Sequence, residues 1–471
     1  MIQWLSLLCF LALQSIHAQN YAPASEKPPQ ITREFRAAWV TSIYNIDWPS
    51  ATGLSVAQQQ AEARAILDKL VSLKMNAVVL QVRPHADALY ASSLEPWSPW
   101  LTGTMGKSPG YDPLAYWIQQ AHARGIEVHA WFNPFRALSN TSQSASGTHI
   151  SRTKPHIIKK FGTILWADPA HPDTRSQALK VILDVVRRYD IDGVHLDDYF
   201  YPYPSGGLTF NDGKSPSQRR AIVDSFVSQL YSSVKREKSW VRVGISPFGI
   251  WRPGVPSGIE AGVDSYEDLA ADSRKWLQKG WVDYLAPQLY WRISPRKQSY
   301  SALLEWWRSQ GSRPVWPGIA TTRIQSSEDP GRPASEIINQ INLSRKIGRN
   351  WVGHIHWSVK GLMKNQGGIT SQIGQVYTQP VAVPPMPWLS RSQPAPPNAG
   401  ATVRDNKTHI QWDAGKAAKT AIQARYGNTW RTVAIVPSGM KAISIPRADA
   451  IALSSLDRFG TASTPKVLGL R

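Results

Sequence analysis

The sequence predicts an α/β protein, a (β/α)8 barrel followed by a small β-sandwich. Between residues 33 and 362, strand-like apolar runs alternate with segments of helical periodicity, and the alternation yields eight strands. A doubly wound open sheet fits less well, because no glycine-rich phosphate loop follows any of these strands. Beyond a proline-rich stretch, the pattern changes to short alternating runs separated by Gly, Asn and Asp, which indicates a β-sandwich.

The elements can be placed in order by their periodicity. The predicted barrel strands cover residues 35–41, 77–82, 127–132, 193–196, 241–245, 284–286, 315–319 and 353–356. The predicted helices between them cover residues 55–73, 114–124, 173–189, 218–235, 266–279, 300–309 and 333–346. The runs of the sandwich cover residues 408–412, 421–426, 432–436 and 442–445. Strand–helix alternation of this kind requires parallel strands, because each helix returns the chain to the same end of the sheet.

The domain boundaries follow from composition. Residues 1–18 form a short apolar run without charged side chains that ends in Ala18, which predicts a signal peptide and export to the periplasm or cell envelope. An N-terminal extension (19–32), the catalytic barrel (33–378), a stiff proline-rich linker (379–397) and the sandwich (398–471) follow. Since no other run reaches 18 apolar residues, we expect no stable insertion into a membrane.

Composition excludes several classes of function. The chain has 471 residues, of which 42% are hydrophobic and 18% charged, as in a globular protein. Its only cysteine is Cys9, which excludes a disulfide framework, a thiolate zinc site and a cysteine nucleophile. The 53 Lys and Arg residues against 33 Asp and Glu give a net charge of +20, which suits an anionic matrix. We expect no nucleic-acid partner, because the sequence carries no recognition motif.

The candidate chemistry lies where the predicted strands end, because barrel enzymes build their sites from the loops at that rim. His195 and Asp197 alternate along one strand and point into the barrel mouth. We interpret Asp197 as the principal catalytic carboxylate, while Asp198 is either catalytic or part of a buried salt bridge. Paired carboxylates beside a histidine and aromatic residues favour the hydrolysis of glycosidic bonds. The 21 Trp residues also favour a carbohydrate substrate, since indole faces stack on sugar rings.

A glycosidase needs a second carboxyl group to protonate the leaving oxygen. The strand at 241–245 has no acidic residue at its end. The open candidates are Asp87, Asp272, Asp47 and Asp268. The structural alternative for Asp87 is a salt bridge to Arg83, and that for Asp272 is a helix-surface or N-cap carboxylate.

Other polar and aromatic residues at the rim are candidates for binding substrate. They are Arg83, His85, Asn133, Arg136, His195, Tyr199, Gln288, Tyr290, Trp291 and Trp357. Arg83, Asn133 and Arg136 offer fixed donors for hydroxyl, carbonyl or carboxylate groups, and Trp291 and Trp357 offer stacking surfaces. We expect no cofactor and no metal, because the rim histidines lack a His-x-His pair after the first strand.

Four segments resemble the glycosyl hydrolase-like ten family of bacterial envelope proteins, some of which act at the division site. They are residues 33–40, 81–90, 193–202 and 286–291. The resemblance implies a (β/α)8 hydrolase that acts on peptidoglycan glycan strands already stripped of their stem peptides. It also implies a fibronectin type III-like module, which matches residues 394–471 here. That module is a candidate for contacts with the cell wall or the division machinery.

The sequence thus predicts a secreted glycoside hydrolase that cleaves β-1,4 bonds in peptidoglycan glycan. The missing carboxyl group at the end of strand 241–245 keeps one alternative open, a non-catalytic protein that binds cell-wall glycan in the barrel mouth. A second alternative is the hydrolysis of another envelope or extracellular polysaccharide, such as an α-glucan.

Overall fold

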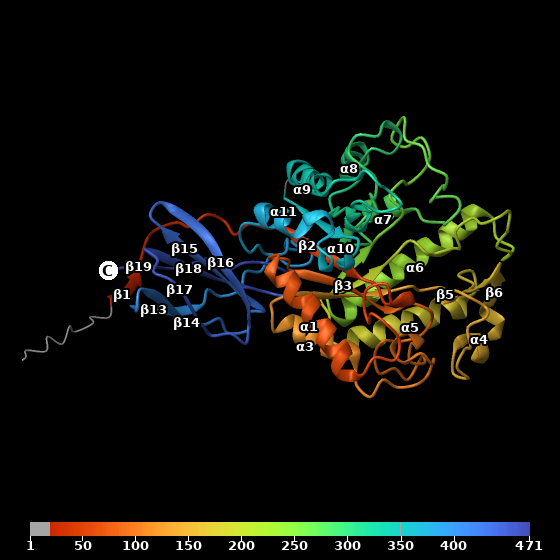
Figure 1. Ribbon diagram of the computed structural model, residues 1–471, viewed down its shortest axis with the longest axis horizontal. Coiled ribbons are helices and arrows are strands. Elements are labelled where there is room, and N and C mark those ends of the chain that lie inside the picture. Colours follow the sequence, from red (N-terminus) through yellow and green to blue (C-terminus); the bar gives the residue numbers. More distant parts are fainter. Residues whose placement is uncertain (1–18, 349) are drawn as a thin grey trace, which may run out of the picture.

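A computed structural model describes residues 19–348 and 350–471 and contains the predicted barrel (Figure 1). The predicted signal peptide lies outside the described residues. The eight barrel strands are β2 (Phe35–Val40), β3 (Ala77–Arg83), β4 (Glu127–Phe132), β8 (Gly193–Leu196), β9 (Arg242–Ile245), β10 (Tyr284–Leu285), β11 (Gly318–Ile319) and β12 (Gly353–His356). They pair in parallel in the order β10-β9-β8-β4-β3-β2-β12-β11. Parallel bridges from Leu285 to Val315 and from Gln288 to Gly318 join the two ends of the sheet and close the barrel.

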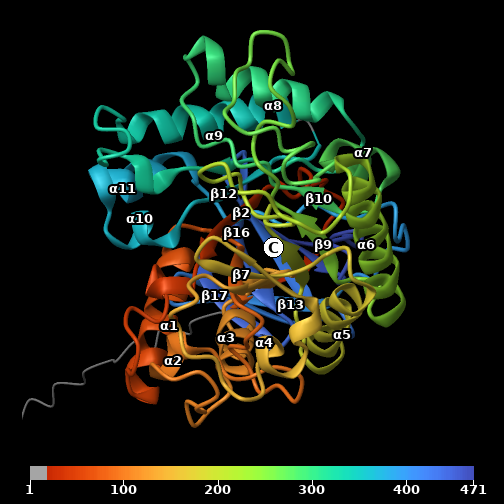
Figure 2. The same cartoon turned by 90° about the vertical axis from the view of Figure 1, so that its right-hand side faces the viewer.

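Helices surround the strands as a ring, which is seen end-on in Figure 2. They are α1 (Val56–Ser72), α2 (Pro99–Thr102), α3 (Pro113–His122), α4 (Ile150–Thr153), α5 (Pro172–Arg188), α6 (Pro216–Glu237), α7 (Ser273–Lys279), α8 (Tyr300–Ser309), α9 (Ala334–Gly348), α10 (Val359–Met363) and α11 (Ile369–Val376). Short 3-10 turns lie at Ile43–Asn45, Pro155–Ile157, Arg296–Gln298, Thr321–Arg323 and Gln366–Gly368. Capping boxes at Ser55 and Ser215 start α1 and α6. Helix α7 is shorter than the predicted 266–279, because the Asp272 carboxylate caps it by accepting from the Lys275 amide.

A small sheet that the sequence analysis does not predict is inserted after β4. Strands β5 (Arg136–Leu138), β6 (Ile158–Phe161) and β7 (Ile164–Ala167) pair antiparallel in the order β5-β7-β6. The strands have three or four residues each, which is too short for an alternating pattern to stand out in the sequence. Strands β5 and β6 lie at the end of the barrel far from the C-terminal sheet (Figure 1).

The C-terminal module is an antiparallel β-sandwich that also takes in a strand from the N-terminal part of the chain. Its strands are β1 (Gln19–Pro23), β13 (Asn398–Arg404), β14 (Lys407–Asp413), β15 (Lys419–Tyr426), β16 (Thr429–Pro437), β17 (Ala442–Pro446), β18 (Ala450–Leu456) and β19 (Lys466–Leu470). Their order is β16-β15-β18-β19-β1-β13-β14-β17. Strand β1 links the two layers, because it pairs with β13 through Asn20 and with β19 through Ala22. Ile410, Ile422 and Ile451 pack together between the layers.

The module packs against the barrel at the amino ends of the strands. The Lys419 amino group lies 3.5 Å from the Glu127 carboxylate at the start of β4, and Arg458 pairs with Asp190 at 2.7 Å. Arg33, which precedes β2, donates a 2.6 Å hydrogen bond to the Gly460 carbonyl of the module. The proline-rich segment runs along this junction, where Ala382 accepts a hydrogen bond from the Glu34 amide and is 4% exposed. The carboxyl ends of the strands therefore remain free of the module.

No helix within residues 19–348 and 350–471 combines the length and the apolar character that a membrane crossing needs.

The Asp283 carboxylate, 1% exposed, ties the junction together. It accepts hydrogen bonds from the Val243 amide (2.8 Å), the Tyr231 hydroxyl (3.1 Å) and the Trp388 indole (2.9 Å), and it pairs with Lys235 (2.5 Å). Asp283→Ala leaves Lys235 buried without an anion, so we expect the free energy of unfolding to fall by about 3–5 kcal/mol in urea titrations.

Asp68→Ala is the matched control. Asp68 also pairs with a basic side chain, that of Arg124, but the Asp68 side chain is 62% exposed. This variant should change the free energy of unfolding by less than about 1 kcal/mol. A comparably small loss for Asp283→Ala would contradict the structural role assigned to that residue.

Candidate active site

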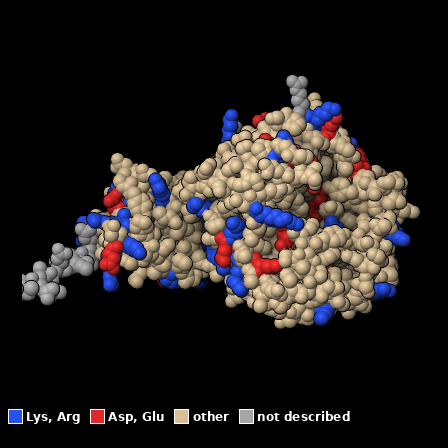
Figure 3. Space-filling model, in the orientation of Figure 1, with Lys and Arg blue, Asp and Glu red and all other residues tan. Residues whose placement is uncertain are grey.

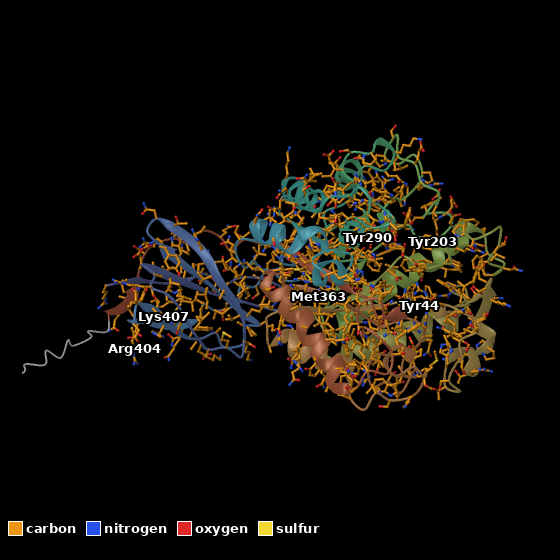
Figure 4. The ribbon with its side chains drawn as sticks, in the orientation of Figure 1. Tyr44, Tyr203, Tyr290, Met363, Arg404 and Lys407 are labelled. Atoms are coloured by element: carbon orange, nitrogen blue, oxygen red, sulfur yellow. The ribbon has the colours of Figure 1, made fainter. Side chains whose placement is uncertain are left out.

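A cavity of about 450 Å³ opens among the loops that follow the carboxyl ends of β2, β4, β8 and β12. Its aromatic lining consists of Tyr44, Trp131, Phe161, Trp166, Tyr199, Tyr203 and Trp357. Tyr44 and Tyr203 lie on the barrel, far from Arg404 and Lys407 of the C-terminal module (Figure 4). A cavity of this size, with aromatic walls and few polar groups, suits a small ligand or a short stretch of sugar polymer.

Asp197 lies directly after β8, lines the cavity and is 4% exposed. Its Oδ2 accepts hydrogen bonds from the Asn133 amide and from the Trp131 indole (3.3 Å), and its Oδ1 accepts one from the Tyr199 backbone amide (3.3 Å). Burial raises the pKa of Asp197, while the Arg136 charge and these donors act to lower it. Burial is the largest effect, so the pKa of Asp197 lies above its usual value, and the Arg136 charge and the donors limit the rise.

The Asn133 side chain is oriented by a chain of hydrogen bonds from β3. The Gln81 amide donates to Asn133 Oδ1 (2.8 Å), and Gln81 Oε1 accepts from the backbone amides of Ser42 and Ile43 (both 3.0 Å). Gln81 Nε2 can only donate, so Asn133 Nδ2 is left to donate to Asp197. The sequence analysis missed Gln81 and Trp131. Both occupy inward-facing positions of their strands, and the alternation of inward- and outward-facing residues along a strand could have identified them.

Asp198 is a second buried carboxyl group next to Asp197, and it is 2% exposed. Its Oδ2 accepts a hydrogen bond from the hydroxyl of Tyr203, which lines the cavity and which the sequence analysis also missed. Burial, followed by repulsion from Asp197, raises the pKa of Asp198 to about 7. Burial thus raises the pKa of both adjacent carboxyl groups, and a carboxyl group with a pKa near neutral is suited to acid–base catalysis.

His195 lies behind the cavity wall instead of lining the cavity. Its Nε2 accepts from the Trp39 indole (3.2 Å), so the neutral ring carries its proton on Nδ1 and donates it to the Tyr284 hydroxyl (3.0 Å). Tyr284 in turn donates to Nδ1 of His129 (2.8 Å). Burial holds the pKa of His195 well below its usual range, so the ring remains neutral. The geometry makes His195 a support for Trp39.

Arg83 ends β3, and His85 and Asp87 lie in the loop that follows; none of the three is part of the cavity lining. Arg83 is buried, with Nε donating to Glu95 (2.7 Å) and Nη1 to the Asn133 carbonyl (2.5 Å). The Asp87 carboxylate accepts from the His85 amide (2.8 Å), and burial raises the pKa of Asp87 to about 6. These contacts shape the loop and hold the backbone that carries Asn133.

The remaining acidic candidates are engaged in local structure. Asp47 accepts from the Thr41 amide (2.8 Å) and the Ser358 hydroxyl (2.6 Å). Asp268 accepts from the Asp264 amide (2.9 Å), and Asp272 caps α7. The structure brings only Asp198, of the carboxyl groups singled out from the sequence, next to Asp197.

Of the other residues predicted to bind substrate, some line the cavity and others lie outside its lining. Trp357 lines the cavity and stacks on Tyr290, with ring centres 6.0 Å apart. The Tyr199 ring also lines the cavity and packs against the Arg136 guanidinium. Trp291 packs edge-on against Phe248 at 5.8 Å, outside the lining. Gln288 hydrogen-bonds the Ser246 carbonyl (3.1 Å) and lies beside Asp198.

The raised pKa of Asp198 links stability to pH. An unfolded aspartate titrates near 3.9, so between about pH 4 and 7 the folded protein holds a proton that the unfolded chain lacks. The stability that this group contributes is full below pH 4 and is lost as the pH rises through 7. Asp198→Asn removes the titration, so the variant should gain about 2 kcal/mol relative to wild type between pH 5 and 8 in urea titrations.

A difference in the free energy of unfolding between Asp198→Asn and wild type that stays constant over this pH range would show that Asp198 titrates normally.

Comparison with known proteins identifies the family. The model of the family Glycosyl hydrolase-like 10 matches residues 34–330. Glycosyl hydrolase YngK of Bacillus subtilis (strain 168) is 41% identical over 404 residues, which cover 81% of this chain and 79% of that protein. Glycosyl hydrolase DigH of Escherichia coli (strain K12) is 32% identical over 338 residues, which cover 64% of this chain and 76% of that protein.

Among solved structures, the catalytic domain of β-amylase from Paenibacillus polymyxa superposes with a TM-score of 0.50 at 11% sequence identity. The match covers 74% of this chain and 98% of that domain, and it supports the barrel fold alone. The chain therefore belongs to the glycosyl hydrolase-like 10 family, and it is a glycoside hydrolase.

Proposed function

We propose that this glycoside hydrolase cleaves β-1,4 bonds of peptidoglycan glycan strands, preferring strands without stem peptides. The observation that carries the proposal is Asp197 in the lining of an aromatic-walled cavity, with the buried Asp198 next to it and linked to the cavity through Tyr203. The net charge of +20 would attract an anionic polymer, and the resemblance to bacterial envelope proteins favours peptidoglycan.

The two carboxyl groups would divide the chemistry. Asp197, whose ionised form is favoured by Asn133, Trp131 and the Arg136 charge, would stabilise or attack the positively charged anomeric centre. Asp198, whose pKa of about 7 leaves it partly protonated near neutral pH, would supply the proton for the leaving oxygen. Tyr203 contacts Asp198 and lines the cavity, so the proton would move in two linked transfers. Protonated Asp198 would donate to the Tyr203 hydroxyl oxygen, and the Tyr203 hydroxyl would give its own proton to the leaving oxygen.

Location and anchoring belong to the proposal as well. Export through the apolar segment at residues 1–18 would place the enzyme in the periplasm or cell envelope. Residues 388–471 carry 12 Lys and Arg against 4 Asp and Glu, and lysine and arginine side chains are spread over the module surface (Figure 3). This module would hold the enzyme against anionic wall polymer, at the end of the molecule opposite the cavity.

Asp197→Asn should reduce turnover at least about 1,000-fold, because it removes the negative charge that the transition state needs. The protein would be incubated with intact peptidoglycan and with amidase-stripped glycan strands, and the products would be identified by mass spectrometry. Wild type should release short oligosaccharides from the stripped strands, with new reducing ends that mark hydrolysis.

The matched control is Asp272→Asn, which makes the same chemical change at a helix cap, where asparagine serves equally well. It should retain wild-type turnover, and both variants should unfold at the wild-type temperature. Release of no product from either substrate by wild type would contradict the proposed substrate. Equal loss of activity in both variants would contradict the role of Asp197.

Tyr203→Phe should move the alkaline limb of the pH–rate profile to higher pH. The Tyr203 hydroxyl donates to Asp198 and so lowers the pKa of that carboxyl, and its removal lets the pKa rise. Because a general acid works only while protonated, activity in the variant should persist to higher pH, although its maximum falls. Initial rates between pH 5 and 9 measure the shift. An alkaline limb at the wild-type pH would show that Asp198 does not donate the proton.

A further inference from the structure

The cavity contains one cation, which is held at the wall beside Asp197. Arg136 begins strand β5, where its pairing with Trp166 of β7 fixes the backbone. Its side chain is 8% exposed, and the guanidinium carbon lies 4.1 Å from the centre of the Tyr199 ring. Among the described residues that line the cavity, Arg136 and Asp197 are the only charged ones.

Arg136 differs from other buried arginines of the barrel in its partners. The paired arginines include Arg36 with Glu34, Arg83 with Glu95 and Arg332 with Asp329. In residues 19–348 and 350–471, Arg136 has no carboxylate at salt-bridge distance. Removing a guanidinium from water without a close anion is unfavourable, so an anionic ligand that enters the cavity gains this unmet interaction.

We propose that Arg136 binds a carboxylate group carried by a sugar residue of the substrate. The guanidinium packs over the Tyr199 ring and also interacts with the Tyr199 hydroxyl, and its remaining N–H groups are available to a ligand. Those groups match both oxygens of a carboxylate, which a hydroxyl or an amide cannot replace with equal strength. The ligand class is a pyranose with an attached carboxylate.

This inference rests on the proposed function and deepens it. In peptidoglycan, the lactyl group of muramic acid carries a free carboxylate only where the stem peptide has been removed, since an attached peptide turns it into a neutral amide. Arg136 would therefore bind muramic acid residues that carry no peptide in preference to those that do. The charge of Arg136 also lowers the pKa of Asp197, and that effect alone would be the same for every substrate.

A comparison of two substrates distinguishes carboxylate binding by Arg136 from its effect on the pKa of Asp197. Stripped glycan strands with free lactyl carboxylates would be compared with the same strands after conversion of these groups to neutral methylamides. Wild type should prefer the free carboxylates by roughly 10- to 100-fold in kcat/KM, the worth of a charged hydrogen bond. Arg136→Met should bring that ratio close to one, and Arg136→Lys should give an intermediate ratio, because lysine keeps the charge without the paired donors.

Arg152→Met is the matched control, since Arg152 lies on α4 in the same insertion and is exposed. It should leave the ratio unchanged, and melting temperatures should show that all variants are folded. Equal losses on both substrates in Arg136→Met would overturn the proposal and assign Arg136 to Asp197 alone. Equal kcat/KM values of wild type on the free-carboxylate and methylamide strands would overturn the proposal as well.

Affinity provides a readout that does not depend on turnover. Asp198→Asn keeps Arg136 and Asp197, so calorimetric titration of this variant with both kinds of strand measures carboxylate preference directly. If wild type cleaves neither substrate, the peptidoglycan proposal fails, and the binding ratio still decides the role of Arg136. A preference for free carboxylates that Arg136→Met abolishes would support the site, whereas equal binding or no binding would overturn it.

Discussion

The buried carboxylate of Asp197 is the constraint on which the site depends. A carboxylate that is 4% exposed remains ionised only if donors replace the water that burial removes. Those donors come from Asn133 and Trp131 at the end of β4 and from the Tyr199 backbone. The barrel is what lets these groups converge, because parallel neighbours such as β4 and β8 end at the same rim.

The need to hold these donors in place also determines the hydrogen bonds of the residues behind the site. The Gln81 amide fixes Asn133, and the loop after β2 fixes Gln81 through two backbone amides. On the other side, Trp39, His195, Tyr284 and His129 form one hydrogen-bonded column through the barrel interior. Each member is buried, and Trp39 and His195 pack edge-on against the cavity residues Trp357 and Trp131, so the column supports the cavity wall.

The sequence analysis identified the fold, Asp197 and several cavity residues, yet it missed Gln81, Trp131 and Tyr203. Strand ends could be found because apolar alternation is local, and a polar residue after such a run is visible in the sequence. Tyr203 lies in a loop of irregular structure, where no periodicity marks which side chain returns to Asp198. Arg83 and Asp87 also lie at a strand end, as Asp197 does, but Arg83 hydrogen-bonds Glu95 and Asp87 accepts from the His85 amide, away from the cavity.

By itself, the sequence determined the alternation of strands and helices, the polar rim, the basic character and the absence of cysteine chemistry, because each depends on composition or on local spacing. Only the tertiary structure decided which rim residues meet. It placed the β5–β7–β6 insertion beside the loop after β8, stacked Arg136 on Tyr199 and set Asp198 against Asp197 in a buried site. Such contacts join segments far apart in the chain, and burial changes their proton affinities in ways that no local pattern records.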